Sequence, residues 1–152
     1  MPLDLNYKPL RMTLEIPSLY LTTEIVEVPE VDGEYPFKWL GNKAGALQGY
    51  ALPGEGKAIL TGHNHLNTME AGPFAFLSEL AIGDRIFVRD QNGGVQIYTV
   101  YVNEKIDEAD FEEFYRISDM DEHSLTLITC EDERIEGGYE HRRVVAAKPL
   151  SE

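Results

Sequence analysis

LTLITC, residues Leu125 to Cys130, is an apolar and β-branched run that ends in the only cysteine of the chain. Such a run predicts a buried strand. A single cysteine cannot form an intramolecular disulfide, so its value lies in packing or in reactivity. Free cysteines are most often buried as small apolar residues. The residues that surround this strand in the sequence nevertheless favour a reactive thiol.

The rest of the chain is rich in short strands and turns. Asn92-Gly93-Gly94, between two alternating segments, is typical of a hairpin turn. We expect an all-β barrel or sandwich in a single domain, with one or two short helices. Strands are expected at 14–17, 23–28, 57–63, 85–89, 95–106, 125–130 and 142–148, a turn-rich loop at 29–36, a short helix at 73–80, and a helix or ordered loop at 107–118.

Composition excludes several classes of protein. The 152 residues hold 13 Lys and Arg against 27 Asp and Glu, a net charge of −14 that argues against a nucleic-acid binder. The length suffices for a core without disulfides or metal. No stretch predicts a transmembrane helix or a signal peptide. We therefore expect either a cytosolic protein or the soluble part of a longer, anchored one.

Two histidines follow the expected strand at 57–63. His63 or His65 is a candidate general acid and base, because imidazole titrates near neutral pH. Residues two apart on an extended strand share a face, so the pair is also a candidate zinc site. No third His or Cys lies at ligand spacing, and we do not expect zinc. A histidine hydrogen-bonded in a loop fits His65 better than His63.

Arg142 and Arg143 open the last expected strand and point to opposite faces of it. A guanidinium beside a reacting carbonyl would stabilise developing negative charge. Each arginine shares its face with a valine and an alanine, so periodicity does not separate the two. A solvated charge on an edge strand is the alternative for either residue.

An acidic stretch, Asp107 to Glu113, offers oxygen ligands of the kind that Ca²⁺ prefers. It lacks the ligand spacing and the glycine turn of an EF-hand loop. We favour a solvated acidic face.

Taken together, these motifs resemble the sortases, the cysteine transpeptidases of bacterial cell surfaces. TLITC at 126–130 resembles the family's TLxTC signature, and KAILTGHN at 57–64 resembles the strand that carries the catalytic histidine. FAFLSELAIGDRI at 74–86 and RRVVAA at 142–147 resemble the following helix with its Gly-Asp turn and the arginine strand. The resemblance implies an eight-stranded β-barrel, with an N-terminal extension at 1–11 and a catalytic domain at 12–150.

The resemblance also implies roles for individual residues. Cys130 would be the nucleophile, His63 the acid and base, and Arg142 the oxyanion-stabilising residue, with Arg143 as the alternative to it. Thr129 would contact the substrate. No cofactor and no metal is expected, because the segment 46–50, which matches a calcium-binding loop of the family, has no carboxylate.

The implied reaction is cleavage of an LPxTG-type sorting motif through a Cys130 thioester, followed by transfer to an amine of a cell-wall precursor or a pilin. The expected location is the extracellular face of the bacterial membrane, through an anchor missing from this chain. We expect the acidic segment 106–123 to disfavour acidic residues in the substrate. Two alternatives stay open, namely a β-barrel cysteine hydrolase and a peptide-binding domain without activity.

Overall fold

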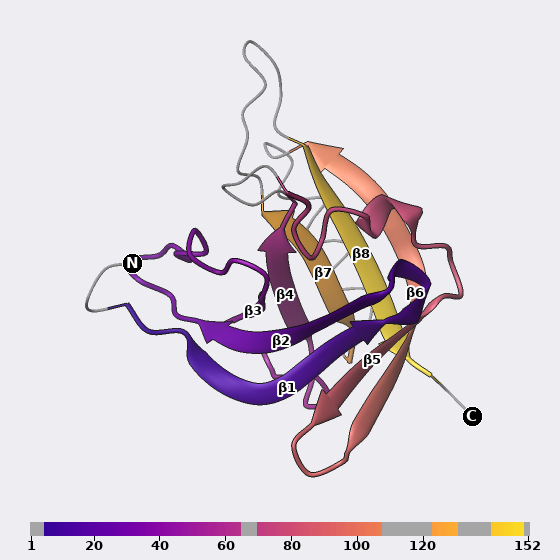
Figure 1. Cartoon of the computed structure of the whole chain (residues 1–152), viewed down its shortest axis with the longest axis horizontal. Coiled ribbons are helices and arrows are strands. Elements are labelled where there is room, and N and C mark those ends of the chain that lie inside the picture. The colour runs from indigo at the N-terminus through magenta and orange to yellow at the C-terminus, as the bar shows by residue number, and fades with distance from the viewer. Residues whose placement is uncertain (1–4, 65–69, 108–122, 131–140, 151–152) are drawn as a thin grey trace.

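The protein forms a closed barrel of eight strands in the order β1-β2-β3-β4-β7-β8-β6-β5 (Figure 1). The computed structural model describes residues 5–64, 70–107, 123–130 and 141–150. The strands are β1 (Lys8–Ile16), β2 (Leu21–Val28), β3 (Ala44–Leu47), β4 (Ala58–His63), β5 (Arg85–Asp90), β6 (Val95–Asp107), β7 (Leu125–Cys130) and β8 (His141–Pro149). The expected eight-stranded β-barrel is confirmed.

Helical structure among the described residues is limited to two short 3-10 helices, η1 (Pro17–Leu19) and η2 (Leu77–Glu79). The helix predicted at 73–80 is therefore shorter than expected. Its first part forms turns with i→i+3 hydrogen bonds instead, since the N–H of Ala75 donates to the carbonyl oxygen of Gly72 at 3.2 Å and the N–H of Leu77 donates to that of Phe74 at 3.4 Å. The Phe74 side chain is buried in the core. No helix in the described ranges is long and apolar enough to cross a membrane.

Sequence patterns did not predict β3. Its sequence, Ala-Gly-Ala-Leu, lacks the β-branched and aromatic residues that mark most strands. It becomes a strand through its neighbours, since it pairs in parallel with β2 and antiparallel with β4. Small side chains suit this position: a Cβ on Gly45 would lie 2.4 Å from Cγ2 of Val28.

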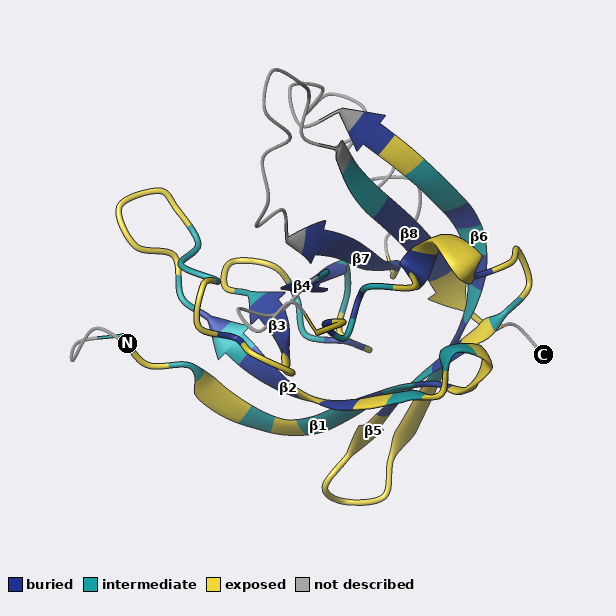
Figure 2. Cartoon of the chain, turned by 45° about the horizontal axis from the view of Figure 1, so that its top comes forward, coloured by how far each residue is buried: buried dark blue, intermediate teal, exposed yellow. Residues whose placement is uncertain are grey.

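The barrel interior is filled by one hydrophobic cluster to which all eight strands contribute. Figure 2 shows β4, β7 and β8 largely buried, whereas the hairpin of β5 and β6 ends in an exposed turn. The phenol of Tyr98 is 1% exposed in this core. Burial raises the pKa of Tyr98, and a hydrogen bond with the Gly54 backbone partly lowers it again.

A second cluster lies on the outer face of the wall formed by β4, β7, β8 and β6, and comprises Ile59, Val102, Ile106, Ile128, Val144 and Ala146. Along β6, the apolar side chains of alternate residues switch from the barrel interior to this outer cluster. Tyr98 and Val100 belong to the interior cluster, but Val102 belongs to the outer one. A register shift against β8 between Val100 and Val102 is the cause, because a bulge inserts one extra residue.

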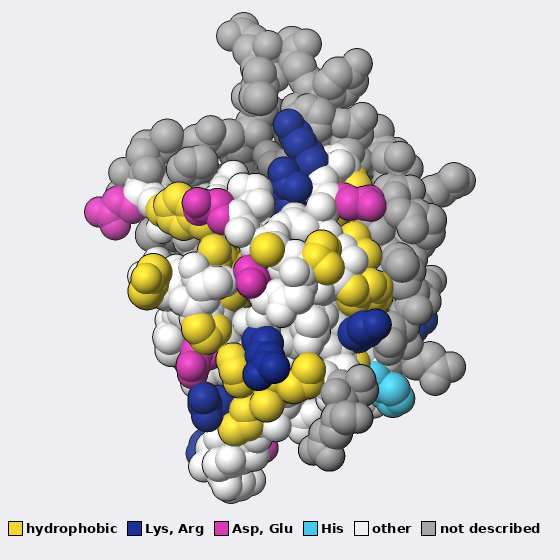
Figure 3. All heavy atoms as spheres, turned by 90° about the vertical axis from the view of Figure 1, so that its right-hand side faces the viewer, with side chains coloured by type: hydrophobic (Ala, Val, Ile, Leu, Met, Phe, Trp, Pro, Cys, Tyr) yellow, Lys and Arg dark blue, Asp and Glu magenta, His cyan; other side chains and the backbone are white. Residues whose placement is uncertain are grey.

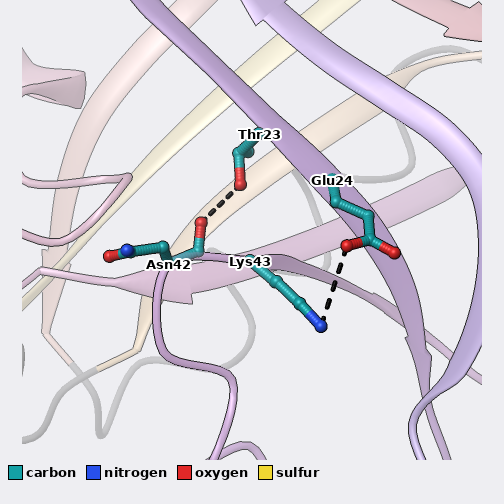
Figure 4. A network of polar contacts seen from close by, with 4 residues as sticks. All are labelled: Thr23, Glu24, Asn42 and Lys43. Atoms are coloured by element: carbon teal, nitrogen blue, oxygen red, sulfur yellow. Dashed lines mark hydrogen bonds and ion pairs between the residues drawn. The ribbon is translucent and has the colours of Figure 1, made fainter.

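The parallel pairing of β2 and β3 requires a long connection, residues 29–43, which lies over the outer face of these strands. Polar contacts attach its end to β2 (Figure 4). The hydroxyl of Thr23 donates to the carbonyl oxygen of Asn42, and Nζ of Lys43 lies 3.7 Å from Oε2 of Glu24. Both charged side chains are about half exposed, so this ion pair contributes little to stability.

Candidate active site

His63 and Cys130 are direct neighbours in the parallel ladder between β4 and β7. The register pairs Gly62 with Thr129 and His63 with Cys130, the last residue of each strand. Strand β8 begins and strand β6 ends at the same end of the barrel, where Asp107 pairs with His141 (Figure 1). Residues far apart in sequence thus meet at one end of the wall.

The alternation along each strand assigns these residues to faces. On β4, His63 follows Ile59 by four residues, so its side chain lies on the same face as this member of the outer cluster. On β7, position 130 has the same parity as Ile128 of that cluster, and on β8 Arg142 has the same parity as Val144. The register between β7 and β8 includes Ile128 opposite Val144. Extended by two residues, it places position 130 opposite position 142.

Arg143 lies on the other face, toward the barrel interior. Its parity is that of Val145, a member of the interior cluster. Its backbone N–H donates to Oγ1 of Thr129 at 3.0 Å, and its Nη1 donates to Oδ1 of Asn103 at 3.3 Å. The structure therefore separates two arginines that periodicity left equivalent. Arg142 shares the outer face with His63, and Arg143 does not.

Thr129 also belongs to the inner face, and its side chain is 4% exposed. Its hydroxyl oxygen accepts the Arg143 N–H and so joins β7 to β8. The substrate contact expected from Thr129 stays a prediction. What the structure shows for this side chain is a link between two strands of the wall.

The imidazole of His63 is 5% exposed and has an aromatic neighbour. The ring of Phe37, on the connection between β2 and β3, packs edge-on against it with 6.4 Å between ring centroids. Tyr7 holds this connection, because its hydroxyl donates to the carbonyl oxygen of Pro36 and accepts the N–H of Trp39 at 3.3 Å. Nothing in the local sequence around Phe37 indicates that it reaches the histidine.

The described segment that begins at residue 70 packs against the backbone of β4 at the histidine. The N–H of Gly72 donates to the carbonyl oxygen of Asn64 at 2.8 Å, and the N–H of Phe74 donates to that of His63 at 3.0 Å. A Cβ on Gly72 would lie 2.2 Å from the carbonyl oxygen of His63. Glycine is required here by the close approach of two backbones.

Some predicted site features lie outside the described residues. They are His65, the acidic segment from 108 to 122, and the side chain of Cys130. In the parts of the chain that the structure does describe, no three His, Cys, Asp or Glu residues gather as a metal site would require. Absence of a metal requirement stays a prediction. Basic side chains on the side of the molecule shown in Figure 3 form several small groups without a continuous patch.

Comparisons with known proteins agree on one family. The model of the Sortase domain matches residues 14–150. Among solved structures, a lid mutant of sortase A from Corynebacterium diphtheriae superposes with a TM-score of 0.71 at 23% identity, over 99% of this chain and 74% of that one. Sortase C-3 from Streptococcus pneumoniae superposes with a TM-score of 0.72 at 21% identity, over 96% and 65%.

A third similar structure is sortase C1 from Streptococcus agalactiae, with a TM-score of 0.68 at 27% identity, over 93% of this chain and 67% of that chain. This chain therefore spans between 65% and 74% of the length of these three proteins. No curated protein matches it in sequence. The similar structures carry both the A and the C designation.

Proposed function

This chain belongs to the sortase family, and on that premise we propose that it is a cysteine transpeptidase. Its substrate is an LPxTG-type sorting motif, which it cleaves through a thioester on Cys130 and transfers to an amine. The observation that carries the proposal is the parallel register that pairs His63 with Cys130, with Arg142 on the face that His63 shares. A nucleophile, a proton-transfer group and a fixed cation are the groups that acyl transfer needs.

In the first half of the reaction, the Cys130 thiolate attacks the carbonyl carbon of the threonine in the motif. The C–S bond forms as the carbonyl oxygen gains negative charge, and the Arg142 guanidinium stabilises that oxyanion. Collapse of the intermediate breaks the C–N bond. The His63 imidazolium gives its proton to the departing amine. The product is a thioester between Cys130 and the threonine carbonyl.

In the second half, an amine of a cell-wall precursor or a pilin attacks the thioester carbonyl. His63, now neutral, accepts the proton that the amine loses, and Arg142 again faces the oxyanion. The C–S bond breaks, the new amide forms, and the thiolate is regenerated. Water in place of the amine gives hydrolysis of the same intermediate.

Sortases are cell-surface enzymes of Gram-positive bacteria, and their substrates are proteins with sorting signals. We place this chain at the extracellular face of the bacterial membrane. The partners that follow from this placement are secreted proteins with a sorting motif and the amine acceptor.

The proposed activity is tested with a fluorescent LPxTG-type peptide, with and without an oligoglycine acceptor. We expect cleavage that depends on Cys130, and a ligated product that grows with acceptor concentration at the expense of the hydrolysed one. Cys130→Ala is the control for thiol dependence. Cleavage that acceptor amines never divert would identify a cysteine hydrolase. Saturable binding of the peptide without cleavage would identify a peptide-binding domain.

A further inference from the structure

Next to the proposed site, on the inner face of the wall, a chain of hydrogen bonds connects four elements. Nδ2 of Asn103, on β6, donates to the carbonyl oxygens of Leu77 at 2.9 Å and Leu80 at 2.8 Å, in and just after η2. Oδ1 of the same side chain accepts from Nη1 of Arg143 on β8. The backbone N–H of Arg143 then reaches Thr129 on β7. We call this chain of bonds the Asn103 brace.

The brace requires an amide at position 103. Both hydrogens of the Asn103 amide go to carbonyl oxygens, which only accept, and its oxygen faces a guanidinium, which only donates. The donors and acceptors fix the orientation of the amide. An aspartate has nearly the same shape, but it would set a carboxylate against two carbonyl oxygens. Leu77 and Leu80 are both buried, so their carbonyls are held by packing as well.

The brace acts where the regular ladder between β7 and β8 comes to its end. The paired residues of the described ladder run from Leu125 with Ala147 to Ile128 with Val144. The next link toward the site is the bond from the Arg143 N–H to the Thr129 hydroxyl. Thr129 directly precedes Cys130, and Arg143 directly follows Arg142. The positions of both site residues therefore depend on their inner-face neighbours.

We propose that Asn103 is a positioning residue for acyl transfer, which holds Arg143 on the inner face and thereby fixes Arg142 on the outer face beside His63 and Cys130. The inference rests on the proposed function of the site. Asn103 touches no reacting atom in this account. It acts through Arg143 and the backbone of β8, because a guanidinium stabilises an oxyanion only when it is held at the correct place.

The test is a pair of isosteric variants that change the net charge equally. Asn103→Asp breaks the brace, and Asn92→Asp places the same charge in the exposed turn between β5 and β6. With the sorting peptide, we expect Asn103→Asp to lower kcat by about tenfold with little change in KM, as misplacement of a catalytic group does. Asn92→Asp should keep the wild-type kcat.

Dependence on Arg142 separates positioning from general destabilisation. Both substitutions are repeated in an Arg142→Lys background, where the guanidinium that the brace would hold is gone. We expect Asn103→Asp to lower kcat there by less than about twofold, since coupled residues are non-additive. An equal loss in both backgrounds, or a wild-type kcat for Asn103→Asp alone, would overturn the proposal.

Two further arms keep the outcome decisive. If Asn103→Asp does not fold, Arg143→Met replaces it, because methionine keeps most of the apolar stem but has no donor for Asn103; the criteria stay the same. If the wild-type protein does not process the peptide, the proposed function fails. Hydrogen exchange of the backbone amides of residues 142–144 then tests the Asn103 brace independently of activity. Faster exchange in Asn103→Asp than in Asn92→Asp supports it, and equal exchange refutes it.

Discussion

The inner and outer faces of β4, β7 and β8 carry different kinds of residue at the same end of the barrel. On the inner face, Thr129 and Arg143 are bonded to each other, and Gly62 lies against the ring of Phe74. On the outer face are His63 and Arg142, with position 130 between them in the register. On each of these three strands, two consecutive residues lie on opposite faces. Under the proposed function, one residue of each adjacent pair faces the reaction and the other packs into the wall that holds it.

Substitution of the two arginines tests this division most strongly. Arg142→Ala should lower kcat/KM by about 100- to 1000-fold, the range seen when an oxyanion donor is removed. Its melting temperature should stay near that of the wild type. Arg143→Met should lower kcat/KM by about tenfold only, and cost about 1 kcal/mol of unfolding free energy through the lost hydrogen bond.

Peptide-cleavage kinetics and thermal unfolding of the two variants check this prediction. A larger loss of activity in Arg143→Met than in Arg142→Ala would reverse the assignment of the faces. Equal losses of activity in both variants would contradict the assignment of catalysis to Arg142 and of support to Arg143.

Two glycines packed near His63 are expected to differ in how much an added methyl group lowers the free energy of unfolding. A Cβ at Gly62 would meet the Phe74 ring at 2.9 Å, whereas at Gly72 it would meet the His63 carbonyl oxygen at 2.2 Å. We expect Gly62→Ala to cost about 1 kcal/mol and Gly72→Ala about 3 kcal/mol, within the range for overpacking. A ring can shift, but a paired backbone cannot. Denaturant unfolding measures both, and a costlier Gly62→Ala would contradict the packing described for His63.

Two threonines on β7 are expected to differ from each other, with the smallest effect of all at Thr126. Oγ1 of Thr129 is hydrogen-bonded, but Oγ1 of Thr126 is buried with no hydrogen-bond partner among the described residues. Thr129→Val should lower the free energy of unfolding by about 1 to 2 kcal/mol, because it leaves the Arg143 N–H without its acceptor. Thr126→Val should be neutral or slightly stabilising. Thr129→Ser, which keeps the hydroxyl, is the control. An equal cost at both positions would contradict the difference between the faces.

The sequence predicted much of the barrel because hydrophobic alternation and turn residues are local signals. The hairpin around Asn92-Gly93-Gly94 and the buried strand that ends at Cys130 both follow the expected bounds closely. β3 was missed because its small residues are strand-forming only between β2 and β4. The helix predicted at 73–80 has apolar residues at helical spacing, but its backbone hydrogen bonds are of the i→i+3 type found in turns and 3-10 helices.

The sequence placed His63, Cys130 and the two arginines near a common site but did not assign their faces. Valine and alanine follow each arginine at the same spacing, so alternation alone gives no answer. Only the register of β8 against β7 and β6 distinguishes Arg142 from Arg143. The sequence alone does not single out Asn103 and Phe37, because their partners lie 23 or more residues away in the chain. A polar residue on an alternating strand resembles any solvent-facing position.

The proposed thioester on Cys130 is tested by intact-protein mass spectrometry of the enzyme mixed with an LPxTG-type peptide in the absence of an acceptor. We expect an adduct with the mass of the peptide acyl group through its threonine, located on Cys130 by peptide mapping and released by hydroxylamine. Cys130→Ala should neither form the adduct nor cleave the peptide. Cleavage that persists in Cys130→Ala would rule out Cys130 as the nucleophile.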